Sequence, residues 1–231
     1  MVKGSFLVYN YRMPGDNAAI TAEKSLFRLF VHAVFPVASA CLDAWGKTWM
    51  RLFGMHVPRS CVVHGSPKVL FMKGALALGE RVHLNNVRTF YAMGQSMPCL
   101  LASEPGARIA IGDDSSLTGT TLYAASGITI GKRVLVGADT KIIDHDGHDV
   151  DSYPRPLKNS CEGIPIVVED DVWIGMDVLV CKGVTIGRGS VIGAKSIVTH
   201  DIPPNVLAAG VPAQVIRPLR LDERERTGGK A

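Results

Sequence analysis

The sequence predicts an all-β solenoid built from flat, three-sided coils of short parallel strands. The first observation is a period of six: between residues 166 and 199, a β-branched aliphatic residue recurs at every sixth position. These positions are Val168, Ile174, Val180, Ile186, Ile192 and Val198. The second observation is that glycine often follows the aliphatic residue, and that a small or β-branched residue stands four positions after it. A repeat of this length is typical of parallel β-helices, and a period of six fits neither an α-helix nor a coiled coil.

Each element of the repeat has a physical reason. The aliphatic side chains can point into a narrow prism, and short β-branched strands can stack coil on coil. Glycine needs no room for a Cβ and can adopt a positive φ, so we expect it to form the turns at Gly175, Gly187 and Gly193.

The same register extends toward the N-terminus with irregularities. The six-residue step is kept by Ile111, Leu117 and Tyr123; one residue is then inserted, and Ile130, Val136 and Ile142 resume the step. Earlier coils hold the spacing more loosely at Met72, Leu78, Leu84 and Phe90. We expect residues 95–107, which contain two prolines, to be an irregular excursion.

The chain of 231 residues predicts one solenoid domain with additions at both ends. We expect an N-terminal extension and helical cap at 1–65, the β-helix at 66–218 with a protruding loop at 143–165, and a charged tail at 219–231. The apolar stretch from Ser25 to Trp45 has helical periodicity and is interrupted by Arg28 and Pro36, so it is short for a bilayer span. A helix there would cover the open end of the solenoid, and peripheral membrane contact is a second interpretation.

Composition narrows the class of protein. Hydrophobic residues at 47% with aromatics at only 6% suit a narrow prism filled by aliphatic side chains. A net charge of +4 allows an acidic ligand such as a nucleotide cofactor, but no basic and aromatic residues alternate as in nucleic-acid-binding proteins. The five cysteines are odd in number and scattered, so we expect a reducing, cytoplasmic location, no disulfides and no metal site.

A polar segment interrupts the repeat between Ile142 and Val168. Two histidines, His145 and His148, and four aspartates fall between Asp144 and Asp151. An aspartate that fixes one imidazole nitrogen as a donor leaves the other as a base near neutral pH. The segment is therefore either the site of a general base or a solvated turn.

Three motifs resemble those of hexapeptide-repeat acyltransferases, the superfamily of maltose and galactoside acetyltransferases and of exopolysaccharide O-acetyltransferases. His148-Asp149-Val150-Asp151 is similar to the family's His-Pro-Leu-Asp, with Asp149 in place of proline. Residues 168–175, which include Trp173-Ile174-Gly175, are close to the family's Ile-Gly-Asp-Asn-Val-Trp-Ile-Gly. The third motif is the ending at 194–203 and 209–217, where His200 replaces a lysine common in the family.

The resemblance implies a left-handed β-helix, a homotrimer, and acetyl-CoA bound in the groove between neighbouring prisms. It implies that His148 is the general base, with His145 as the alternative, and that Asp151 either holds His148 or closes the turn before Tyr153. Trp173 is expected to line the groove or to pack at the trimer contact, and Lys195 and Arg217 to meet the phosphates of the donor. The full set of implied donor contacts is Trp173, Gly175, Ala194, Lys195, Ser196, Thr199 and Arg217.

The expected reaction is direct attack by a hydroxyl of a sugar or glycan precursor on the thioester of acetyl-CoA. Two alternatives belong to other classes of protein. Carbonic anhydrases of the gamma class use the same solenoid and bind zinc through three histidines, so the two loop histidines leave a zinc enzyme possible. The third interpretation is a trimeric scaffold without catalytic activity.

Overall fold

The computed structural model describes residues 35–70, 76–87, 95–149, 151–154 and 162–220. Two compact units divide the chain, Met1–Ala40 and Cys41–Ala231, and the fold below is that of the second unit. Part of the predicted amphipathic stretch, residues 25–34, lies outside the described residues, as do Met72 and Phe90. No helix in the described part of the chain is both long enough and apolar enough to span a bilayer.

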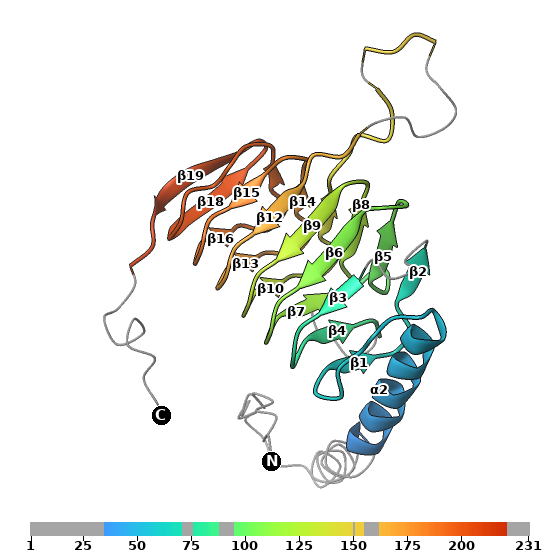
Figure 1. The fold of residues 1–231 in the computed structure, drawn as a ribbon. Helices are drawn as coiled ribbons and strands as arrows, with labels where there is room; N and C mark the ends of the chain where they lie inside the picture. Colours follow the sequence, from blue (N-terminus) through green and yellow to red (C-terminus); the bar gives the residue numbers. More distant parts are fainter. Residues whose placement is uncertain (1–34, 71–75, 88–94, 150, 155–161, 221–231) are drawn as a thin grey trace, which may run out of the picture. The chain divides into compact units, whose positions relative to one another are not determined.

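The second unit is a left-handed parallel β-helix with three flat faces, which confirms the predicted fold class (Figure 1). Each face is one sheet, and the strands of successive coils pair in parallel, except that β19 at the end of sheet A pairs antiparallel with β18. Sheet A contains β1 (Val62–His64), β4 (His83–Asn85), β7 (Ser116–Thr118), β10 (Leu135–Val136), β13 (Trp173–Ile174), β16 (Val191–Ile192), β18 (Val206–Gly210) and β19 (Ala213–Pro218). Sheet B contains β2 (Lys68–Leu70), β5 (Leu100–Ser103), β8 (Thr121–Ala124), β11 (Lys141–Ile143), β14 (Leu179–Val180) and β17 (Ile197–Val198). Sheet C contains β3 (Leu76–Leu78), β6 (Arg108–Ile111), β9 (Gly127–Ile130), β12 (Ile166–Val168) and β15 (Thr185–Ile186).

The core is a stack of aliphatic side chains, one column per sheet. In sheet A the parallel register aligns the buried residues Leu84, Leu117, Val136, Ile174, Ile192 and Ala208. Because successive side chains of a strand point to opposite faces, the neighbours of these residues point outward. From residue 168 onward, the aliphatic residues that the sequence predicts to point inward are the ones that are buried in the structure.

Two predictions about the earlier coils are wrong. Tyr123 was expected to point inward, but Leu122 takes the inward position, paired with Ile142, and Tyr123 is half-buried on the outside. The step from Leu117 to Leu122 is five residues and the step from Leu122 to Ile130 is eight. Together they are one residue longer than two regular steps of six, which is the one inserted residue that the sequence predicts. The predicted irregular excursion at 95–107 contains a regular strand, β5, which pairs with β2 and β8.

The repeated glycines serve close packing rather than an unusual backbone conformation. A Cβ on Gly175 would lie 2.6 Å from the backbone nitrogen of Ala194 in the next coil, and one on Gly187 would lie 2.6 Å from that of Pro204. The left-handed backbone conformation occurs instead at other turn residues, including Asp171 (φ 63°) and Asp177 (φ 55°). Short polar side chains tolerate this conformation better than branched ones do.

The N-terminal end of the solenoid is covered by the part of α2 (Phe35–Leu52) that follows Ala40, in agreement with the helical cap of the predicted fold class. Gly46 lets the helix approach closely, because a Cβ there would lie 2.4 Å from the carbonyl oxygen of Val63. Asp43 accepts the backbone N–H of Val63 at 2.7 Å, and Met50 is fully buried. The cap thus satisfies an edge group of the first strand and closes the apolar core.

Charged residues form an alternating ladder along the corner between sheets C and A. Arg81 makes two hydrogen bonds to Asp114, at 2.5 and 2.7 Å, and Arg133 makes two to Asp171, at 2.5 and 2.9 Å. Lys132 pairs with Asp113 at 3.1 Å in the same corner. The hydrogen bond from Arg81 lowers the pKa of Asp114, and that from Arg133 lowers the pKa of Asp171.

This ladder predicts a loss of stability in acid. A carboxylate with a lowered pKa in the folded state stabilises the fold above its unfolded pKa of about 3.9, and the contribution disappears as the pH falls through the folded value. We therefore expect the melting temperature to fall more steeply below about pH 4 in the wild type than in Arg133→Gln. Arg108→Gln, which removes an exposed charge from β6, is the control and should keep the wild-type slope. Parallel slopes for wild type and Arg133→Gln would contradict the prediction.

Candidate active site

The polar loop leaves the solenoid after β11, at the corner between sheets B and C, and returns just before β12. Figure 1 shows the chain extending from the solenoid at this corner. Its two ends meet: the backbone N–H of Ile164 donates to the carbonyl oxygen of Asp144 at 2.8 Å. Lys182 forms an ion pair with Asp146 from the same corner of the next coil. The described ends of this segment therefore leave and rejoin the solenoid at one corner, where the sequence predicts a loop.

The position of Asp144 in the sequence allows it to hold an imidazole, but in the structure it binds the backbone instead. Its carboxylate is fully buried and accepts three backbone N–H groups, from Ala125, Ser126 and Gly127. Asp149 accepts the backbone N–H of Asp151 at 3.0 Å. At least these two aspartates of the loop therefore bind backbone amides.

His145 is buried and its ring has a defined orientation. Its Nδ1 accepts the backbone N–H of Gly147 at 3.0 Å, and its ring meets that of Tyr123 edge to face, with centroids 4.5 Å apart. A neutral imidazole whose Nδ1 is an acceptor carries its proton on Nε2. That Nε2 is buried and has no hydrogen-bond partner among the described residues. Neither nitrogen of His145 is thus free to accept a proton in this conformation.

His148 is exposed, three residues beyond His145. Gly147 precedes it with φ 80°, which allows the chain to turn sharply between the two histidines. Asp151 is also exposed and uses its backbone N–H to bind Asp149. In the described part of the loop, the structure gives no hydrogen bond between Asp151 and His148.

Tyr123 and Glu104 form a second polar pair beside His145 that the sequence did not predict. The hydroxyl of Tyr123 donates to Glu104 Oε1 at 2.5 Å, and both side chains are partly exposed. The six-residue period assigned Tyr123 to the core, so nothing in the sequence indicated a polar contact from its hydroxyl. The signal that could have revealed it is the irregular spacing after Leu117.

Trp173 and Gly175 belong to the same strand and turn but have different environments. Trp173 is 55% exposed on the outer face of sheet A, in register between Leu135 and Val191. Gly175 lies against the next coil, where its neighbour Ala194 is exposed. Trp173 can therefore contact a ligand or another subunit, whereas Gly175 has a packing role.

Lys195 and Ser196 follow in the turn between β16 and β17. Lys195 is exposed and pairs with Asp177 at 3.0 Å, and this lysine lowers the pKa of Asp177. Ser196 is buried; its hydroxyl donates to the carbonyl of Gly193 at 2.6 Å and accepts the N–H of Gly210 at 3.1 Å. Both contacts of the Ser196 hydroxyl hold turns of the solenoid together.

Thr199 and Arg217 are exposed at the C-terminal end. The hydroxyl of Thr199 lies 2.9 Å from His200 Nδ1, so this pair forms one polar group. Arg217 lies on β19 and donates to the carbonyl oxygen of Pro218 at 3.0 Å. Its guanidinium has further N–H groups available for an anion.

Most of the predicted residues border sheet B, on its two sides. Turns from sheet A to sheet B carry Gly175, Ala194, Lys195 and Ser196. Turns from sheet B to sheet C carry His145, His148 and Thr199. Between the two corners, Lys141, Leu179 and Ile197 are in register on the outer face of sheet B. Trp173 and Arg217 lie on sheet A.

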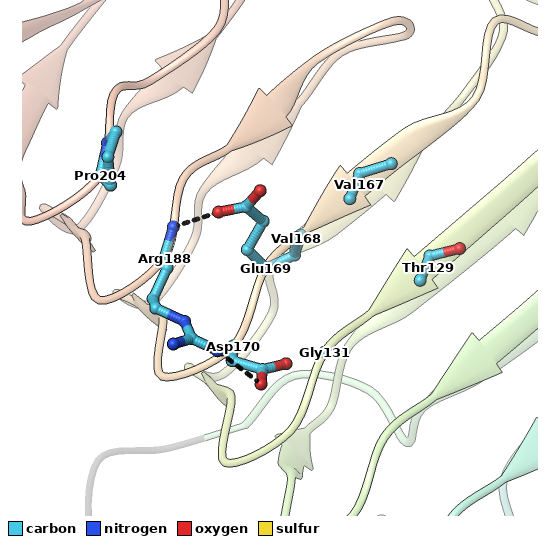
Figure 2. A pocket seen from close by; sticks show the side chains of 8 residues that line it. All are labelled: Thr129, Gly131, Val167, Val168, Glu169, Asp170, Arg188 and Pro204. Carbon is cyan, nitrogen blue, oxygen red and sulfur yellow. Dashed lines mark hydrogen bonds and ion pairs between the residues drawn. The ribbon is translucent and has the colours of Figure 1, made fainter.

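A separate groove of about 630 Å³ lies on sheet C and contains none of the predicted site residues. Its lining includes Thr129, Val167, Pro204 and Arg188 (Figure 2). Arg188 donates its backbone N–H to Glu169 at 2.7 Å and its guanidinium to Asp170 at 3.2 Å. The charges of this groove are already paired within the chain, which makes it a poor candidate for binding an anionic donor.

The described residues contain no group of three or more His, Cys, Asp or Glu side chains placed to hold a metal ion within one chain. Cys181, next to Lys182, is half-buried, and burial raises the pKa of its thiol. A thiol with a raised pKa is a weak nucleophile at neutral pH.

Comparison with known proteins confirms the resemblance to hexapeptide-repeat transferases. Residues 165–200 match the family model for the bacterial transferase hexapeptide (six repeats). Galactoside O-acetyltransferase of Escherichia coli is 49% identical over 92 residues, which cover 40% of this chain and 44% of that enzyme. The matched part of this chain therefore spans less than half the length of that relative. WcaF of Escherichia coli, assigned as an acetyltransferase of colanic acid biosynthesis, is 29% identical over 184 residues, or 80% of each chain.

Among solved structures, the N-acyltransferase AntD of Bacillus cereus, in complex with an amino-deoxy sugar nucleotide and coenzyme A, is similar with a TM-score of 0.62. The match covers 79% of this chain and 94% of AntD at 18% sequence identity. At this identity the likeness concerns the fold alone.

Proposed function

We propose that this chain, which carries the bacterial transferase hexapeptide repeat, transfers an acetyl group from acetyl-CoA to a hydroxyl of a sugar or glycan precursor. The observation that carries the proposal is the loop at the corner between sheets B and C, which presents an exposed imidazole, His148, beside a fixed and buried one, His145. The names of the relatives support a sugar as acceptor and an acyl thioester as donor.

His148 is the general base in this proposal. A free hydroxyl is a weak nucleophile at neutral pH, so a base must take its proton as the oxygen attacks the thioester carbonyl. The new C–O bond forms as the C–S bond breaks, and the imidazolium of His148 returns the proton to the departing thiolate. His145 is less suited to this role because its Nδ1 accepts the N–H of Gly147 and its Nε2 is buried.

The donor is proposed to lie over sheet B, between its two corners. Leu179 and Ile197 give this face an apolar strip suited to a narrow acyl arm, and Ala194 leaves room at its edge. Lys195, Thr199 and Arg217 are exposed, and they are proposed to meet phosphates of the donor. Ser196 and Gly175 support this surface from inside through the turn contacts that they make.

The active unit is proposed to be a homotrimer. Trp173 and Leu135 leave an exposed apolar strip on sheet A, with 55% and 51% of their surfaces accessible. A neighbouring prism packed there would supply the second wall of a donor groove. Asp151 is proposed to orient His148 once acceptor and donor are bound.

A thiol-release assay with acetyl-CoA and a panel of sugars, amino sugars and nucleotide sugars tests the proposal against its two alternatives. We expect thiol release that depends on the acceptor and an O-acetylated product. Stoichiometric zinc together with no binding of acetyl-CoA would instead indicate the zinc enzyme, and neither zinc nor thiol release with any acceptor would indicate the scaffold. Acetylation confined to amino sugars would move the acceptor atom from oxygen to nitrogen.

A further inference from the structure

The turn after β8 forms an anion-binding nest, and the chain fills it with its own carboxylate. The backbone N–H groups of Ala125, Ser126 and Gly127 point at Asp144 over distances of 2.6, 2.8 and 2.7 Å. Successive N–H groups in a turn make a concavity suited to anions. Asp144 is fully buried there, so the carboxylate exchanges water for three hydrogen bonds from the backbone.

The irregular spacing of the repeat at this point creates the nest. The step from Leu122 to Ile130 is eight residues instead of six, and the additional residues form the turn that holds the three N–H groups. The turn belongs to the coil before the loop, whereas Asp144 is the first residue of the loop after β11. The longer turn in one coil thus supplies the N–H groups that bind an aspartate of the next coil.

Both ends of the loop meet at this carboxylate. The carbonyl oxygen of Asp144 accepts the backbone N–H of Ile164 at 2.8 Å. Gly163 lies directly against the nest, because a Cβ there would be 2.7 Å from the nitrogen of Ser126 and 3.0 Å from Asp144 Oδ1. The outgoing end, the returning end and the preceding coil are therefore joined at one buried group.

His145 is the next residue, so Asp144 is the shortest covalent link between its ring and the scaffold. The ring lies against Tyr123, a residue of β8, whose strand leads into the nest. From this arrangement we propose that Asp144 is the positioning residue of the histidine loop. Its carboxylate, seated in the nest, fixes the start of the loop so that His145 keeps its Nδ1 toward Gly147 and His148 is presented to the reactants. The proposal rests on the proposed function for its catalytic consequence only.

Asp144→Asn is the variant that tests this role. The amide keeps the size of the side chain but replaces one acceptor oxygen with a donor that faces backbone N–H groups. Asp113→Asn is the matched control, because Asp113 accepts the backbone N–H of Glu80 at 2.9 Å in a turn of another corner. Gly163→Ala is a second variant; its Cβ would clash with Ser126 of the nest and crowd the Asp144 carboxylate without removing it. This variant keeps the proposal testable if Asp144→Asn does not fold.

Three measurements decide the outcome. In Asp144→Asn and Gly163→Ala we expect faster hydrogen exchange at residues 125–127, loss of the single Nε2–H tautomer of His145 in nitrogen NMR, and a fall in kcat of about 10- to 100-fold with the KM for acetyl-CoA unchanged. Asp113→Asn should change none of these. The proposal is overturned if exchange quickens at residues 125–127 while the tautomer and kcat stay as in the wild type. If the wild type transfers no acetyl group, the proposed function fails, and the exchange and NMR results still decide whether Asp144 positions His145.

Discussion

Replacement of Ile174 by alanine is expected to lower the free energy of unfolding by about 2–5 kcal/mol. Ile174 is fully buried and lies in register with Val136 and Ile192, so its removal leaves a cavity in the middle of the aliphatic column of sheet A. A flat coil has few alternative side chains that could move into the space. Urea unfolding with a common m value measures the loss.

The neighbouring residue provides the control. Trp173 is adjacent in the same strand but 55% exposed, so Trp173→Ala should cost less than half as much stability although it removes a larger side chain. Equal losses for the two substitutions would contradict the alternation of inward and outward residues on which the donor surface depends. Under the proposed function, Trp173→Ala should instead raise the KM for acetyl-CoA.

His148→Ala is expected to reduce kcat by about 10²–10⁴-fold, the range for loss of a general base. The KM for acetyl-CoA should stay close to that of the wild type, because the imidazole acts on the acceptor hydroxyl. The side chain is exposed, so the fold should be unaffected, and steady-state thiol release measures both constants.

His145→Asn is the comparison that assigns the base. The amide oxygen of asparagine can take the place of Nδ1 and accept the N–H of Gly147, so the loop can keep its conformation. We expect a much smaller loss of turnover than in His148→Ala. A folded His145→Asn protein with a loss as large as that of His148→Ala would transfer the role of base to His145.

The sequence predicts the regular part of this fold well because a fixed period determines register. Once Val168 and Ile174 are assigned inward, each later coil repeats the assignment, and the structure agrees through Val198. The error at Tyr123 has a physical cause. The steps of five and eight residues on the two sides of Leu122 have the same sum as the expected steps of six and seven, so the error shifts only this strand, by a single residue, and exchanges its two faces.

The local chemistry of the loop is less predictable from sequence. The cluster of histidines and aspartates predicts a loop, but the partner of each aspartate depends on contacts between coils. Asp144 binds amides that lie 17 to 19 residues earlier, and no spacing within the loop indicates them. The sequence also left open whether glycine is needed for a positive φ or for close packing. At Gly175 the reason is close packing against the next coil, a contact that only the three-dimensional arrangement reveals.

A crystal structure of the protein with CoA tests the central claim most directly. The account predicts the thiol end of CoA beside the loop, within hydrogen-bonding reach of His148 directly or through one water, and the pantetheine arm over sheet B. CoA bound in the groove on sheet C beside Arg188, or with its thiol end remote from both histidines of its own and neighbouring chains, would contradict the account.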